Sequence, residues 1–65
     1  MTPEDLRRTL RLYPQYFQTY GNRGIAYYTK MDYDRAIADY DEALRLNPNY
    51  ANAYGNRGLA YAGRL

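Results

Sequence analysis

Apolar residues recur along this chain every three or four positions, the spacing that places them on one face of an α-helix. No stretch alternates apolar and polar residues at the two-residue period of a β-strand, so the pattern predicts no strands. Proline, glycine and asparagine residues divide the pattern into four segments. These segments predict helices over about residues 3–12, 15–30, 32–46 and 49–62. The short loops between them predict that neighbouring helices run antiparallel.

The predicted helix boundaries rest on local signals. Thr2 is a typical N-cap, Pro3 suits the first helical position, and Asp5 lies where a capping box places its acidic residue. Pro14 and Pro48 are expected to end the first and third helices, because the residue before a proline disfavours the α conformation.

Five residues of the second predicted helix return unchanged in the fourth. Residues 20–24 and residues 54–58 both read Tyr-Gly-Asn-Arg-Gly, 34 positions apart, and a fixed period of this size is typical of repeat proteins. Gly24 and Gly58 lie inside otherwise good helices, where glycine costs ~1 kcal/mol relative to alanine. Their recurrence at the same position predicts close helix–helix contact, with Ala36 and Ala43 as the expected counterparts on the third helix. The rings of Tyr20, Tyr27 and Tyr40 are expected to fill the space around this contact.

The spacing of aromatic and small residues between positions 20 and 48 resembles the tetratricopeptide repeat. The residues at its signature positions are Tyr20, Gly24, Tyr27, Ala36, Tyr40 and Pro48. Arg23 stands where the family usually has leucine, so an arginine stem must cover that core position. Met31 stands where the family usually has the glycine that ends a helix, and a left-handed backbone there would cost ~1–2 kcal/mol.

The resemblance implies an all-α fold of antiparallel helix-turn-helix repeats, stacked as a short right-handed superhelical solenoid of four helices. Its register divides a single domain, residues 1–65, into three parts. Residues 1–14 correspond to the second helix of a preceding repeat, residues 17–48 to one complete repeat, and residues 51–65 to the first helix of the next. One interpretation of this phase is an excerpted or engineered fragment of a repeat array.

Composition argues against several kinds of function. The chain has no cysteine and no histidine, which removes thiolate ligands, the commonest metal ligand and the usual general base. We therefore expect no enzyme activity, no bound metal and no cofactor. A net charge of +2 with dispersed basic residues argues against nucleic acid, and no apolar run is long enough for a membrane span. These features favour a soluble, cytoplasmic protein.

Asp39, Asp41 and Glu42 form the one close group of carboxylates in the sequence. Two arginines lie four residues from members of this group, which places Arg35 beside Asp39 and Arg45 beside Asp41 on one helix. We interpret the group as a solvated helix face with these two ion pairs, rather than as a metal or acid–base site.

By resemblance, the first helix of each repeat lines a concave groove that holds an extended peptide or a helix of a partner protein. The expected groove residues are Gln18, Asn22, Ile25, Tyr28, Asn52, Asn56 and Leu59. By the same register, Gly21 is also expected to face the groove. Asn22 and Asn56 are the best candidates for holding a peptide backbone, because an amide side chain both donates and accepts hydrogen bonds. The alternative is that asparagine is simply tolerated at this repeat position.

A second functional hypothesis is self-association. The fourth helix presents Tyr54, Gly58 and Tyr61 without a following helix to cover them, while Leu6 and Leu10 lie on the type of helix that covers such a face. Molecules would then join head to tail or exchange helices. Under this hypothesis the chain is a structural repeat unit or a designed scaffold whose partner is another copy.

Overall fold

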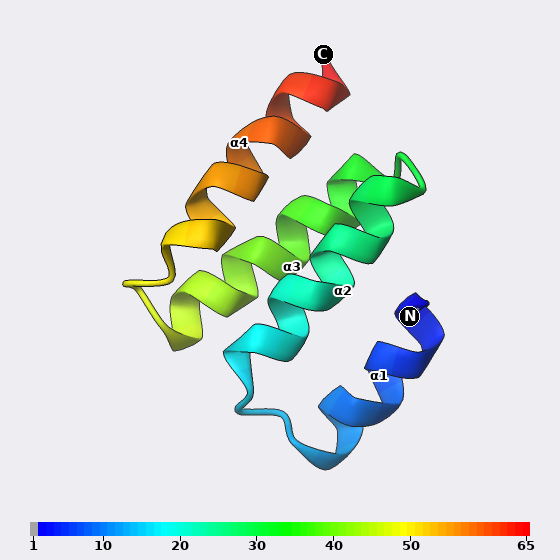
Figure 1. Cartoon of the computed structure of the whole chain (residues 1–65), viewed down its shortest axis with the longest axis vertical. Helices are drawn as coiled ribbons and strands as arrows, with labels where there is room; N and C mark the ends of the chain where they lie inside the picture. Colours follow the sequence, from blue (N-terminus) through cyan, green and yellow to red (C-terminus); the bar gives the residue numbers. More distant parts are fainter. Residues whose placement is uncertain (1) are drawn as a thin grey trace.

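The computed structural model describes residues 2–65, which form four helices and no strand (Figure 1). Helix α1 spans Pro3–Leu12, α2 Phe17–Thr29, α3 Tyr33–Leu46 and α4 Ala51–Arg64. The all-α prediction is confirmed. No helix within these residues is long and apolar enough to cross a membrane.

Two matching turns set the starts of α2 and α4, each two residues later than predicted. The Tyr16 N–H donates to the carbonyl of Tyr13 at 3.2 Å, and the Tyr50 N–H donates to the carbonyl of Asn47 at 3.1 Å. Each turn has proline at its second position, where the fixed φ of proline is favourable. The residue after each proline therefore belongs to the turn and not to the helix.

The capping box at the start of α1 is present as predicted. The Thr2 hydroxyl accepts a hydrogen bond from the Asp5 N–H at 3.3 Å, and the Asp5 carboxylate accepts one from the Thr2 N–H at 3.4 Å. Two N–H groups that the helix itself leaves unpaired are thereby satisfied.

Consecutive helices pack as antiparallel pairs, with α2 and α3 side by side at the centre of the molecule, α1 on one side and α4 on the other (Figure 1). Helix α4 packs mainly on α3 and also contacts α2, whereas α2 is the one helix of the described chain that packs on α1. This arrangement leaves one side of α1 and one side of α4 without a neighbouring helix.

The core lies between α2, α3 and α4 and combines small residues with tyrosine rings. Its buried members are Tyr27, Ala36, Ile37, Tyr40, Ala43, Leu44, Ala53 and Ala60. Tyr40 is the largest fully buried side chain and is only 1% exposed. Burial disfavours its phenolate and raises the pKa of Tyr40 to about 12.

Gly24 permits a close contact with α3, and the neighbour is Tyr40, one of the three rings that were expected around it. A Cβ atom on Gly24 would lie 2.6 Å from Cε1 of Tyr40, so the flat ring of Tyr40 fills the space that glycine leaves. Gly21 is used in the same way, because a Cβ there would lie 2.8 Å from the hydroxyl oxygen of Tyr50. The Gly21 backbone is therefore covered by Tyr50 and does not face a groove.

The loop between α2 and α3 turns through Met31, whose φ is 61°. The Met31 N–H donates to the Tyr28 carbonyl and the Asp32 N–H to the Tyr27 carbonyl, each at 2.9 Å. This is the hydrogen-bond pattern of a Schellman motif, in which glycine usually holds the left-handed position. Met31 therefore holds the left-handed position that glycine usually takes in this family.

Candidate functional site

Four of the seven predicted groove residues line one small pocket between α2 and α4. Ile25 and Tyr28 come from α2, and Asn56 and Leu59 come from α4. Tyr40 of α3 also contributes to the lining, which encloses about 150 Å³. The pocket walls are thus aliphatic and aromatic, with one amide group among them. The 34-residue repeat accounts for this convergence, because Ile25 and Leu59 occupy equivalent positions of two packed helices.

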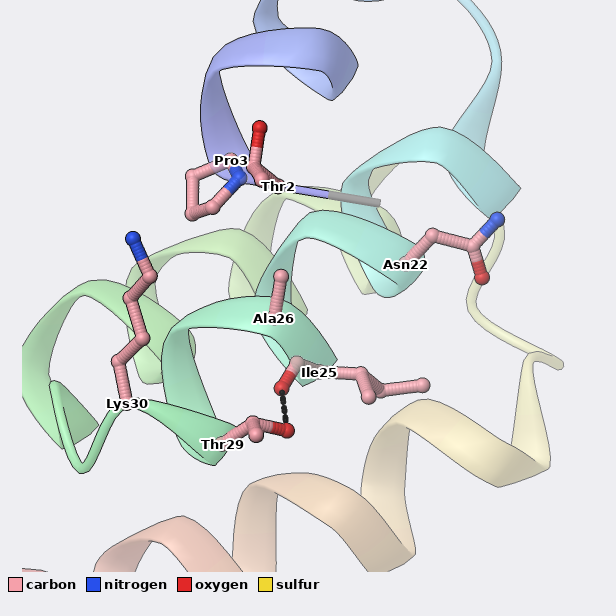
Figure 2. Close-up of a pocket in the computed structure, with 7 residues that line it drawn as sticks. All are labelled: Thr2, Pro3, Asn22, Ile25, Ala26, Thr29 and Lys30. Atoms are coloured by element: carbon pink, nitrogen blue, oxygen red, sulfur yellow. Dashed lines mark hydrogen bonds between the residues drawn. The ribbon is translucent and has the colours of Figure 1, made fainter.

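A larger and more open hollow lies on the other side of Ile25, between α2 and the start of α1 (Figure 2). It encloses about 430 Å³, and its lining residues are Thr2, Pro3, Asn22, Ile25, Ala26, Thr29 and Lys30. The Thr29 hydroxyl donates to the Ile25 carbonyl at 3.0 Å, so its proton is already engaged within the helix. Lys30 carries the one charge in this lining.

The remaining groove candidates are more dispersed. Asn22 is exposed and lines the larger hollow with Ile25. Gln18 and Asn52, which are repeat equivalents, are exposed near the starts of α2 and α4 and line neither of these two hollows. Ile25 is shared by both hollows and is therefore the centre of the candidate site.

Sequence patterns did not identify Thr2, Pro3 or Lys30 as members of the site. Thr2 and Pro3 are far from α2 in the sequence, and they reach the hollow only because α1 packs on α2. Lys30 lies at the C-cap of α2, which showed no signal beyond its charge.

The prediction of a solvated face on α3 is wrong for Asp39, whereas Asp41 is exposed and Glu42 is half-buried. Asp39 is buried and accepts two hydrogen bonds from Arg23 of α2, at 2.7 Å from Nε and 2.6 Å from Nη2. These hydrogen bonds raise the pKa of the Arg23 guanidinium above its ordinary value. Arg23 also lies 5.8 Å from the ring centres of both Tyr20 and Tyr27. Arg23, which stands where the family usually has leucine, is therefore paired with a buried carboxylate on the neighbouring helix.

The other predicted pairs on α3 are also replaced. Asp41 pairs with Arg57 of α4 at 2.7 Å, and Arg45 pairs with Glu42 one turn away at 3.0 Å. Arg35 lies 3.5 Å from Asp32 instead of pairing with Asp39. Partners on neighbouring helices have displaced two of the expected same-helix contacts.

The predicted self-association residues fall into two groups. Tyr54 and Tyr61 on α4 are 50% and 43% exposed, and a Cβ on Gly58 would meet no atom within 4 Å. Leu6 and Leu10, in contrast, are only 3% and 7% exposed. Because α2 is the one described helix that packs on α1, both leucines are buried within the chain itself. The prediction that they offer a free face to a second molecule is corrected accordingly.

A family model described as the tetratricopeptide repeat matches residues 17–50, just over half of the chain. The chain belongs to the tetratricopeptide repeat family. Comparison with curated proteins finds no match. Tetratricopeptide repeats are in general modules of protein–protein interaction built on a non-enzymatic repeat fold. The family therefore makes a protein or peptide the expected class of partner.

Proposed function

We propose that this tetratricopeptide chain holds an extended segment of a partner protein across α2 and α4. The observation that carries the proposal is the meeting of Ile25, Tyr28, Asn56 and Leu59 around one apolar pocket. We also infer that residues 1–14 and 51–65 act as half repeats on either side of the complete repeat, and that the stack curves as a right-handed superhelix whose inner side is this surface.

Burial of apolar side chains would supply most of the affinity. Ile25 and Leu59 are both exposed in the free chain, although each lies beside the buried ring of Tyr40 in the pocket lining. Covering such a side chain completely is worth ~1.5–3 kcal/mol. A partner residue with an aliphatic side chain matches the size and the apolar lining of the pocket.

Polar groups at the edge of this surface would orient the partner segment. Asn56 offers a donor and an acceptor beside the apolar pocket, and Asn22 offers the same pair in the larger hollow. An extended peptide has unpaired N–H and C=O groups that suit such amides. Lys30 at the far end of the larger hollow favours an acidic residue in that part of the partner.

The proposal can be tested with random peptides selected for binding to the immobilised chain. Selected peptides should share an aliphatic residue, and their affinity should fall about tenfold or more for Asn56→Ala and for Leu59→Ser. Tyr54→Ser is the matched control, because Tyr54 is 50% exposed on α4, close to the 57% of Leu59, but lies outside the pocket. Equal binding to all three variants would contradict the proposal.

Self-association is a second candidate, which the exposed Tyr54–Gly58–Tyr61 face of α4 favours. Because Leu6 and Leu10 are buried on α2, they could cover the α4 face of another molecule only through an exchange of helices, and a head-to-tail contact would need a different covering surface. Light scattering over a concentration series distinguishes the two candidates, because a groove binder keeps its monomer mass and a self-associating unit does not.

A further inference from the structure

We propose that the pocket between α2 and α4 takes a short aliphatic side chain that bears a hydroxyl group, as threonine does, and that the Tyr40 hydroxyl selects it through a hydrogen bond. This inference rests on the proposed function and adds one requirement to it. The residues from α2 and α4 favour an aliphatic side chain, whereas Tyr40 of α3 determines which group that side chain carries.

The Tyr40 side chain is almost completely buried, and its hydroxyl has no partner within the described residues. It is only 1% exposed, and no hydrogen bond joins the hydroxyl to another residue of the described chain. In the same residues, every fully enclosed side-chain nitrogen or oxygen does have a hydrogen-bond partner. The Tyr40 oxygen is therefore not fully enclosed, and since Tyr40 lines the pocket, the pocket is where this oxygen is reached.

Gly24 holds the ring of Tyr40 in this position. A Cβ atom on Gly24 would lie 2.6, 2.9 and 3.0 Å from Cε1, Cδ1 and Cζ of the ring, so this edge of the ring lies directly against the α2 backbone. Cζ is the carbon that bears the hydroxyl, and the residue after Gly24 is Ile25, which lines the same pocket. A ring packed in this way cannot turn its hydroxyl elsewhere, so the pocket presents a hydrogen-bonding group at a fixed place.

The surroundings of this hydroxyl disfavour both a purely aliphatic side chain and an ionised one. A side chain without a polar group would shield the Tyr40 hydroxyl from water and leave it unpaired, which opposes binding. None of the five residues that line the pocket is charged at neutral pH. A carboxylate or an ammonium group would therefore be shielded from water there without a counter-ion.

Threonine satisfies both kinds of group in the pocket. Its methyl group suits the aliphatic side chains of Ile25 and Leu59, and its hydroxyl can donate to or accept from the Tyr40 oxygen. Burial raises the pKa of Tyr40 to about 12, so the phenol keeps its proton at neutral pH and can both donate and accept.

Two peptides that differ in one group test the proposal. An alanine scan of a peptide selected on the immobilised chain identifies the residue whose replacement has no further effect in the Leu59→Ser variant. That residue is then made threonine in one peptide and valine in the other, which have nearly the same shape, so the pair reports the hydroxyl alone. Titration calorimetry with the full chain should show about tenfold tighter binding of the threonine peptide.

Removing the Tyr40 hydroxyl should abolish this preference. Tyr40→Phe keeps the ring on Gly24 and should bind the two peptides equally well or prefer the valine peptide. Tyr28→Phe is the matched control, because Tyr28 is a half-buried tyrosine of the same pocket lining, and it should keep the preference of about tenfold. Urea titration verifies that both variants are folded, and the comparison of the two peptides on the unmodified chain needs no variant.

Equal binding of the two peptides by the unmodified chain would overturn the proposal, and so would a threonine preference that Tyr40→Phe retains. In both cases the proposed function stands if Leu59→Ser still weakens binding. If Leu59→Ser binds every selected peptide as tightly as the unmodified chain does, the proposed function itself fails and this inference fails with it.

Discussion

Gly24 and Gly58 follow the same four residues but have opposite surroundings, so replacing each with alanine should have different effects on stability. A Cβ atom on Gly24 would lie 2.6, 2.9 and 3.0 Å from three carbons of the Tyr40 ring, well inside the ~3.5–4.0 Å separation of carbons in contact. The ring is 1% exposed and cannot turn into solvent, so α2 and α3 must move apart. Overpacking of this kind costs ~1–3 kcal/mol.

The helix propensity of alanine acts at both positions and stabilises each variant by ~1 kcal/mol. Gly58→Ala should therefore raise the free energy of unfolding by about that amount, because no atom lies within 4 Å of the new methyl group. In Gly24→Ala the overpacking opposes this gain. The difference in the free energy of unfolding between the two variants therefore measures the packing cost at Gly24, which we expect to be ~1–3 kcal/mol. Gly24→Leu should be less stable still.

Thermal unfolding followed by far-UV circular dichroism measures this difference. For a domain of this size, 1 kcal/mol corresponds to a shift in Tm of about 4–8 °C, so Gly24→Ala should melt at least about 4 °C below Gly58→Ala. Equal melting temperatures, or a higher one for Gly24→Ala, would show that Tyr40 does not pack on Gly24 closely enough to resist a methyl group.

Three further predictions concern the buried ion pair, a tyrosine and the strained loop. Asp39→Ala should lower the free energy of unfolding by ~1–3 kcal/mol, because Arg23 loses a buried partner. Asp41 is exposed, so Asp41→Ala should change the free energy of unfolding by no more than ~0.5 kcal/mol. Urea titration of both variants measures this difference. Burial raises the pKa of Tyr40 from 10.0 to about 12, so the folded state holds this proton more tightly than the unfolded state. The resulting stability is complete below pH 10 and is lost as the pH rises towards 12, and Tyr40→Phe should show a smaller loss over this range in urea titrations. Met31→Gly should raise Tm by a few degrees, because relief of ~1–2 kcal/mol of left-handed strain exceeds the added backbone entropy of glycine, and a lower Tm would refute the strain.

The helices and their order were predictable because their signals are local. The apolar spacing, the capping box at Thr2 and the prolines at positions 14 and 48 act within a few residues of the boundaries that they set. The left-handed Met31 was predictable for a similar reason, since the position after the last helical turn has a fixed role in the Schellman motif.

Ion pairs and apolar contacts between helices were predicted less well, because the spacing of residues in a sequence indicates only partners on the same helix. Arg35 and Asp39 are one turn apart, yet Asp39 binds Arg23, which lies 16 residues away on the neighbouring helix. The burial of that site makes a bidentate, shielded pair more favourable than a solvated one. Leu6 and Leu10 were assigned to an intermolecular face because the amphipathic pattern identifies an apolar side but not what covers it.

The candidate site was half predictable. Repeat register placed Ile25, Tyr28, Asn56 and Leu59 on facing helices, and the structure brings these four together. Register could not include Lys30 or the start of α1, since their proximity depends on how α1 packs on α2.

Chemical-shift mapping of a selected peptide on the isotope-labelled chain tests the proposed interaction surface most directly. The account predicts the largest changes at Ile25, Tyr28, Asn56 and Leu59, with smaller changes at Asn22 and Lys30. Changes confined to the outer sides of α1 and α3, with none at these pocket residues, would contradict it.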